Sequence, residues 1–167
     1  MKTFPILLVE DNPDDVFLIE RAFHVVQIEH PLFTVSDGQQ AIDYLSGKGR
    51  YDDRSVYPFP RLILADLKMP GVTGFDLIRW IRQDANMRLV PVIVLSSSSL
   101  PEDVNRSYML GANAYMVKPP DPRALERLFG TIAQFWSAGE APNISWSSTP
   151  SPTSMQESPP NPKAVLK

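Results

Sequence analysis

Five short apolar runs alternate with segments whose apolar residues recur at helical spacing, and this alternation limits how the chain can fold. The runs are residues 6–9, 32–35, 62–65, 90–95 and 114–117, and all but Thr34 of their residues are apolar. Continuous apolar runs of this length are typical of parallel strands that are buried on both faces. Strands that alternate with amphipathic helices predict an α/β fold, with a doubly wound five-stranded parallel sheet and five helices.

The predicted helices have recognisable first residues. Pro13 suits the start of a helix that follows the first strand, because proline tolerates the first helical position. Asp121 can cap the last helix, and Pro122 can open it. Glu102 and Asp103 fall in the first turn of the fourth helix, where their charges suit the helix dipole, and we expect a structural role for them.

One domain and a tail account for the length of the chain. The 167 residues are 43% hydrophobic, which supports a single core. We predict that residues 1–137, which contain the five strand and helix units, form this domain. Residues 138–167 are rich in Ser and Pro, so they bury too little apolar surface to offset the entropy of ordering, and we expect a disordered tail.

Composition argues against several classes of function. A formal charge of −3 gives no basic field that would attract nucleic acid or a membrane surface. The absence of cysteine excludes disulfides, thiolate metal sites and cysteine nucleophiles. No apolar run approaches the roughly 20 residues that a transmembrane helix needs, and the N-terminus lacks the apolar core of a signal peptide. We expect a cytoplasmic protein that binds neither nucleic acid nor membranes.

Chemically reactive side chains stand at the ends of four predicted strands. Glu10 and Asp11 follow the first strand and Asp66 follows the third. Ser96 follows the fourth strand and Lys118 the fifth. Because doubly wound sheets bind ligands beyond the carboxyl ends of their strands, we expect these side chains to lie together.

The predicted cluster has the components of a phosphoryl-transfer site. Three carboxylates repel one another and favour a cation, and hard oxygen ligands suit Mg²⁺. With Mg²⁺ present, Asp66 can act as a nucleophile toward phosphorus, while the Ser96 hydroxyl and the Lys118 ammonium stabilise the transferring group. The sequence therefore predicts an acyl phosphate on Asp66.

Four motifs resemble the receiver domain family of two-component signalling. They lie at residues 7–11, 65–71, 94–97 and 115–119 and read LLVED, ADLKMPG, VLSS and YMVKP. The resemblance covers about residues 5 to 137 and implies a flavodoxin-like receiver fold with Asp66 as phosphoacceptor. It also implies that Mg²⁺ is bound by Glu10, Asp11, Asp66 and the main-chain carbonyl of Lys68.

The same resemblance implies a conformational switch. Ser96 would hydrogen-bond a phosphoryl oxygen, Lys118 would ion-pair with it, and Tyr115 would turn inward when Ser96 moves. Ser96 stands where threonine is commoner in the family, so the hydroxyl is retained but the stiffness of β-branching is lost. A cis peptide bond before Pro119 is also implied.

Other features resemble the small response regulators that partner bacterial and cyanobacterial phytochromes. They are the sequence EDNPDD at residues 10–15, a long connection before the third strand, and a last helix that ends in Phe135 and Trp136. The implied partner is a sensor histidine kinase, with a phytochrome-type kinase as one candidate. Tyr108, Tyr115 and the two C-terminal aromatics also suggest a homodimer, through the fourth helix, fifth strand and fifth helix or through Trp136.

Two other functions fit parts of the pattern. A phosphorylation-independent pseudo-receiver adaptor would share the fold, but it has no need of clustered carboxylates. Haloacid-dehalogenase-like phosphatases also use a strand-end Asp with Mg²⁺, but they need a second Asp two residues later, where this chain has Lys68. We therefore expect no enzyme activity beyond self-phosphorylation from small donors and autodephosphorylation.

Overall fold

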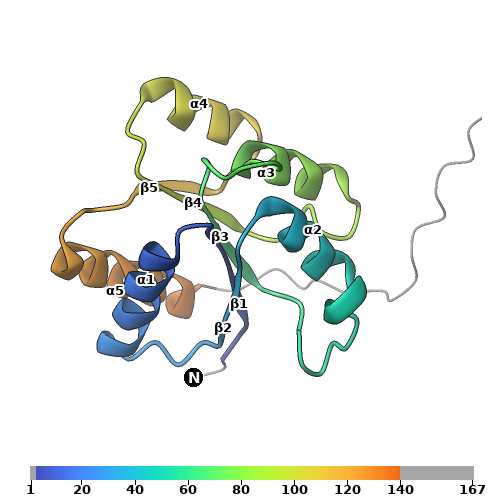
Figure 1. Ribbon diagram of the computed structural model, residues 1–167. Helices are drawn as coiled ribbons and strands as arrows, with labels where there is room; N and C mark the ends of the chain where they lie inside the picture. The colour runs from blue at the N-terminus through green and yellow to red at the C-terminus, as the bar shows by residue number, and fades with distance from the viewer. Residues whose placement is uncertain (1–2, 140–167) are drawn as a thin grey trace, which may run out of the picture.

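A computed structural model describes residues 3–139, which form one parallel sheet with helices on both faces (Figure 1). The strands are β1 (Ile6–Val9), β2 (Leu32–Val35), β3 (Leu62–Ala65), β4 (Val92–Ser96) and β5 (Ala114–Val117). The strand order is β2-β1-β3-β4-β5, and all four neighbouring pairs are parallel. This confirms the predicted doubly wound α/β fold.

The helices divide between the two faces of the sheet. They are α1 (Pro13–Val25), α2 (Gly38–Ser46), α3 (Gly74–Gln83), α4 (Pro101–Met109) and α5 (Pro122–Ala138), with a short 3₁₀ helix at Gly49–Tyr51. Figure 1 shows α1 and α5 side by side on one face and α2, α3 and α4 on the other. Pro13, Pro101 and Pro122 each open a helix, and the Asp121 carboxylate accepts a hydrogen bond from the Ala124 main-chain N, as a cap does.

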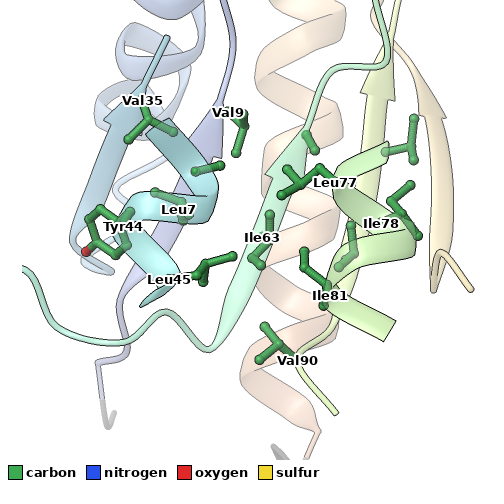
Figure 2. Packing of buried hydrophobic residues seen from close by; sticks show 14 of the residues in the cluster. Leu7, Val9, Val35, Tyr44, Leu45, Ile63, Leu77, Ile78, Ile81 and Val90 are labelled. Carbon is green, nitrogen blue, oxygen red and sulfur yellow. The ribbon is translucent and has the colours of Figure 1, made fainter. Parts of the chain in front are cut away.

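Successive strand residues contribute to two separate cores. Leu7 and Ile63 lie in the first core, beneath α2 and α3, where Leu77, Ile78 and Ile81 pack against the sheet (Figure 2). The neighbouring strand residues face α1 and α5 and belong to the second core; they are Ile6, Leu8, Leu62 and Leu64. Because side chains alternate across a strand, covering both faces buries every position of the three central strands β1, β3 and β4, which explains their nearly continuous apolar runs.

The fourth strand is predicted at residues 90–95 but is observed at Val92–Ser96, so it begins two residues later and ends one residue later. Val90 is buried, but its main-chain N donates to the Met87 carbonyl in a turn. Pro91 has no N–H to donate to a neighbouring strand, so the ladder starts after it. Hydrophobicity alone does not separate this buried turn from the strand.

The long connection between α2 and β3 is anchored by one arginine. Arg54 donates from Nη1 to the Tyr44 carbonyl at 2.7 Å and from Nη2 to the Leu45 carbonyl at 3.0 Å. These carbonyls lie in the last turn of α2, where the regular helical partners run out. The rings of Tyr51 and Tyr57 pack edge to face, with their centroids 5.1 Å apart, and close the segment over the first core.

The described part of the chain ends two residues beyond the predicted domain boundary at residue 137. Helix α5 continues to Ala138, and the predicted tail from residue 140 onward lies outside the described residues. Within residues 3–139, no helix has the length and apolar character that crossing a bilayer requires.

Candidate functional site

Three carboxylates meet at the carboxyl edge of β1 and β3. Glu10, Asp11 and Asp66 each place one oxygen within 4.8 Å of the oxygens of the other two. The hydrogen bond from the Asp66 main-chain N to the Val9 carbonyl, at 3.0 Å, joins the two strand ends. Glu10 and Asp66 are buried, at 2% and 8% exposure, whereas Asp11 is exposed. This set of oxygen donors fits a hard divalent cation with one side open to water.

Lys118 extends from the end of β5 into this carboxylate cluster. Its Nζ lies 2.6 Å from Glu10 Oε2, 2.8 Å from Asp15 Oδ2 and 3.8 Å from Asp66 Oδ1. The Lys118 side chain is 10% exposed, so these interactions are little screened by water. Lys118 therefore contacts Glu10 and Asp66, which are both predicted site residues, and also Asp15.

Burial and hydrogen bonding act in opposite directions on the pKa values of Glu10 and Lys118. Desolvation raises the pKa of Glu10 above its ordinary value, although the hydrogen bond from Lys118 acts to lower it. For Lys118, desolvation acts to lower the pKa, but hydrogen bonds to Asp15 and Glu10 outweigh it and leave the pKa raised. Glu10 is thus a buried carboxylate that is stabilised by a proton or by a nearby cation.

The backbone after Asp66 is held by close contacts with two glycines. Gly74, the first residue of α3, donates its main-chain N–H to the Leu67 carbonyl at 3.0 Å. A Cβ added to Gly74 would lie 2.2 Å from the Asp66 carbonyl oxygen, and one added to Gly38 would lie 2.3 Å from the Val72 carbonyl oxygen. Both helix starts therefore pack directly against the loop that carries Asp66 and Lys68.

Ser96 is the last residue of β4 and is fully buried. Its Oγ accepts a hydrogen bond from the Ser98 main-chain N at 3.3 Å, and its carbonyl accepts one from the Lys118 main-chain N at 2.8 Å. The ends of β4 and β5 are thereby joined, as expected from the sequence.

Tyr115 has its side chain directed inward. The ring is half-buried against the first core, and the hydroxyl donates to the Ser98 carbonyl at 2.9 Å. The inward orientation is the one that the receiver resemblance associates with movement of Ser96. No motif in the sequence indicates that Ser98 is the partner of Tyr115.

Two acidic residues at the site were not predicted to act there. Asp15 binds Lys118, and Asp103 lies 3.6 Å from the Lys68 ammonium, measured from Oδ2 to Nζ. Asp15 lies in the EDNPDD segment, so the acidic run itself was the available signal. For Asp103, the only sequence signal is its position in the first turn of the fourth helix. For Lys68, the sequence predicts a role for the main-chain carbonyl alone.

The peptide bond before Pro119 differs from the expectation, and the two aromatic residues near the end of α5 differ from each other in exposure. No cis peptide bond occurs within residues 3–139, so the bond before Pro119 is trans and the cis expectation is wrong. The trans form of such bonds is favoured by about 0.5–1 kcal/mol. Of the C-terminal aromatics, Phe135 is 71% exposed, whereas Trp136 is half-buried against the second core.

Comparison with known proteins gives consistent matches. The family model described as the response regulator receiver domain matches residues 6–129. A probable methanogenesis regulatory protein, FilR2 of Methanothrix harundinacea, is 34% identical over 149 residues, which are 89% of each chain. The response regulator Rcp1 of Synechocystis sp. is 34% identical over 131 residues, covering 78% of this chain and 87% of Rcp1.

Two solved structures extend the comparison to three dimensions. The phosphorylated cyanobacterial phytochrome response regulator RcpA has a TM-score of 0.78 and 34% identity, over 85% of this chain and 100% of RcpA. The Mn²⁺-bound form of Rcp1 has a TM-score of 0.75 and 33% identity, over 83% of this chain and 99% of that chain. With the family model spanning most of the sequence, the chain belongs to the response regulator receiver domain family.

Proposed function

We propose that this response regulator is a phosphorylation switch that accepts a phosphoryl group on Asp66 from a sensor histidine kinase. The observation that carries the proposal is the position of Asp66, which lies among the oxygens of Glu10 and Asp11 and 3.8 Å from the Lys118 ammonium. A nucleophilic carboxylate beside a cation site and a buried ammonium is suited to phosphoryl transfer.

In the proposed reaction an Asp66 oxygen attacks the phosphorus of a phosphohistidine. The P–N bond breaks, its electron pair leaves with the imidazole, and an acyl phosphate forms on Asp66. Lys118 would exchange part of its contact with Glu10 and Asp15 for a phosphoryl oxygen, and Ser96 would donate its hydroxyl hydrogen to another. Tyr115 would follow Ser96 as the switch.

The proposed cation is Mg²⁺, bound by Glu10, Asp11, Asp66 and the main-chain carbonyl of Lys68. It would neutralise the clustered carboxylates and the incoming phosphoryl oxygens. The Mn²⁺-bound form of Rcp1 supports a divalent ion in this family. The three oxygens within 4.8 Å of one another support the same choice here.

A phytochrome-type kinase is the proposed donor, because RcpA is described as a phytochrome response regulator and is similar over its whole length. Residues 1–137 would serve as the receiver domain and 138–167 as a tail, with a cytoplasmic location. Hydrolysis would be limited to the protein's own acyl phosphate, since Lys68 supplies no general acid for outside phosphate esters.

Asp66→Asn is expected to abolish phosphorylation, because the amide has no nucleophilic oxyanion. Wild-type protein incubated with acetyl phosphate and Mg²⁺ should gain the mass of one phosphoryl group, measured by mass spectrometry of the intact chain. The Asp66→Asn variant should gain none, and removal of Mg²⁺ by a chelator should lower incorporation into the wild type to background.

Asp14→Asn is a matched control for the phosphorylation experiment. Asp14 is exposed and lies within the same acidic run, so the variant loses an equal charge near the site without altering the nucleophile. It should be labelled like the wild type. Equal labelling of the Asp66→Asn variant would refute the proposed acceptor, and a wild type that is never labelled and binds no Mg²⁺ would favour the pseudo-receiver alternative.

A homodimer through α4 and β5 is a second part of the proposal. Tyr108, Met109 and Val117 expose 51%, 87% and 45% of their surface on these elements, and exposed apolar side chains of this kind are typical of interfaces. Light scattering should give twice the monomer mass for the phosphorylated protein, and Met109→Glu should return it to the monomer. A monomeric mass in both phosphorylation states would contradict the dimer.

A further inference from the structure

A chain of polar contacts joins the loop after Asp66 to the side chain of Tyr115. The Lys68 ammonium lies 3.6 Å from Asp103 Oδ2, and the Ser98 hydroxyl donates to the same oxygen at 2.5 Å. The Ser98 carbonyl in turn accepts from the Tyr115 hydroxyl at 2.9 Å. The loop after Asp66 and strand β5 therefore both contact the segment that contains Ser98 and Asp103.

Ser98 is held at its main-chain N, its carbonyl and its side chain. Its main-chain N donates to Ser96 Oγ at 3.3 Å, and its own Oγ accepts from the Leu100 main-chain N at 3.4 Å. Ser98 is 9% exposed, so water competes little for these bonds. This one residue therefore contacts both the Tyr115 hydroxyl and the Ser96 hydroxyl.

Asp103 is the charged member of the set and is itself well anchored. Its side chain is 17% exposed, and its carbonyl accepts a hydrogen bond from the buried Ser107 hydroxyl at 2.8 Å. A hydrogen bond to a carboxylate is stronger than one between neutral groups. Asp103 is thus a fixed point on α4 against which Ser98 is held.

We propose that Asp103 is a positioning residue that stabilises the inward orientation of Tyr115 by holding Ser98. The inference rests on the proposed phosphorylation of Asp66, because Tyr115 would turn inward when Ser96 hydrogen-bonds a phosphoryl group on Asp66. A contact made in only one of two arrangements shifts the equilibrium toward that arrangement. Lys68 adds a link between Asp103 and the loop that carries the acceptor.

The affinity for beryllofluoride tests this inference. Beryllofluoride bound to a carboxylate mimics a phosphoryl group, and its binding in the presence of Mg²⁺ can be measured by titration. Asp103→Ala and Ser98→Ala should each weaken binding about tenfold, which is the effect of a charged hydrogen bond present in only one state. The double variant should be no weaker than either single variant, because both substitutions remove the same bond.

The orientation of Tyr115 provides a second readout that general destabilisation would not reproduce. In protein labelled with 3-fluorotyrosine, the Tyr115 resonance is assigned by its loss in Tyr115→Phe. Asp103→Ala should move this resonance toward the solvent-exposed position, and Asp103→Asn, which keeps an oxygen acceptor for Ser98, should move it less.

Glu102→Ala is the matched control, since Glu102 is exposed and carries the same charge in the same helical turn. It should bind beryllofluoride like the wild type. Equal affinities for Asp103→Ala and Glu102→Ala, with an unchanged Tyr115 resonance, would overturn the inference and leave the proposed phosphorylation intact. Binding that persists unchanged in Asp66→Asn would instead refute the proposed acceptor.

Discussion

Lys118→Met is expected to lower the free energy of unfolding by about 3 kcal/mol at neutral pH without divalent ions, because it leaves a buried charge without its partner. Glu10 is 2% exposed, and Lys118 Nζ is 2.6 Å from its Oε2. Methionine retains most of the length of lysine and removes only the charged end. Urea denaturation at pH 7 measures the loss.

The loss in Lys118→Met should depend on both pH and Mg²⁺. Burial raises the pKa of Glu10, so the folded state binds a proton at this group more tightly than the unfolded chain does. Stability from this group is therefore present at low pH and is lost as the pH rises through the raised pKa. The deficit of the variant should shrink as the pH falls through that pKa. Added Mg²⁺ should also reduce it, because the cation should bind the unpaired carboxylates of the variant more tightly and so stabilise the variant more than the wild type.

Lys48→Met provides the control for loss of one positive charge. Lys48 is exposed, so its removal should change the free energy of unfolding by no more than about 0.5 kcal/mol. If the two lysine variants were equally stable at every pH, the contact between Lys118 and Glu10 would have no energetic importance.

Gly74→Ala is expected to destabilise the fold by about 3 kcal/mol, the upper range for forcing extra atoms into a packed site. The added Cβ would lie 2.2 Å from the Asp66 carbonyl oxygen, and backbone cannot move aside as a side chain can. Because the displaced group is the acceptor's own backbone, phosphorylation by acetyl phosphate should slow by roughly 100-fold, as misplacement of about 1 Å can do.

Gly130→Ala is the matched control for the glycine substitution. Gly130 lies inside α5, and a Cβ there would meet nothing within 4 Å. Alanine is favoured over glycine within a helix by about 0.8 kcal/mol, so this variant should be slightly more stable than the wild type. Thermal unfolding and the phosphorylation rate should both separate the two variants. Similar values would show that the contact between Gly74 and Asp66 has no consequence.

The sequence predicts the sheet well because burial on both faces makes the central strands β1 and β3 apolar throughout, and the edge strands β2 and β5 are mostly apolar. Four strands begin and end at the predicted residues, since each apolar run covers a whole strand. The predicted start of β4 was wrong because Val90 is buried in a turn before Pro91, and burial alone does not distinguish a turn from a strand.

The carboxylate cluster was predictable because parallel strands place their last residues at one edge. Glu10, Asp11 and Asp66 therefore meet as expected. The acidic run at residues 10–15 is a signal for Asp15, but the contacts of Asp15 and Asp103 depend on how α1 and α4 are oriented against the sheet. No local sequence pattern encodes that orientation, and Asp103 resembles an ordinary helix-start acid.

The placement of the helices on opposite faces of the sheet has a consequence for how two partner proteins could bind this protein. Helix α1 adjoins the Lys118 end of the site, whereas α4 carries Asp103 on the far side of the sheet (Figure 1). A protein bound against α1 and another bound against α4 would compete for little common surface. If the proposed kinase bound against α1 and a recipient against α4, the two could therefore be bound at the same time, and the donor would not have to leave before the recipient arrives.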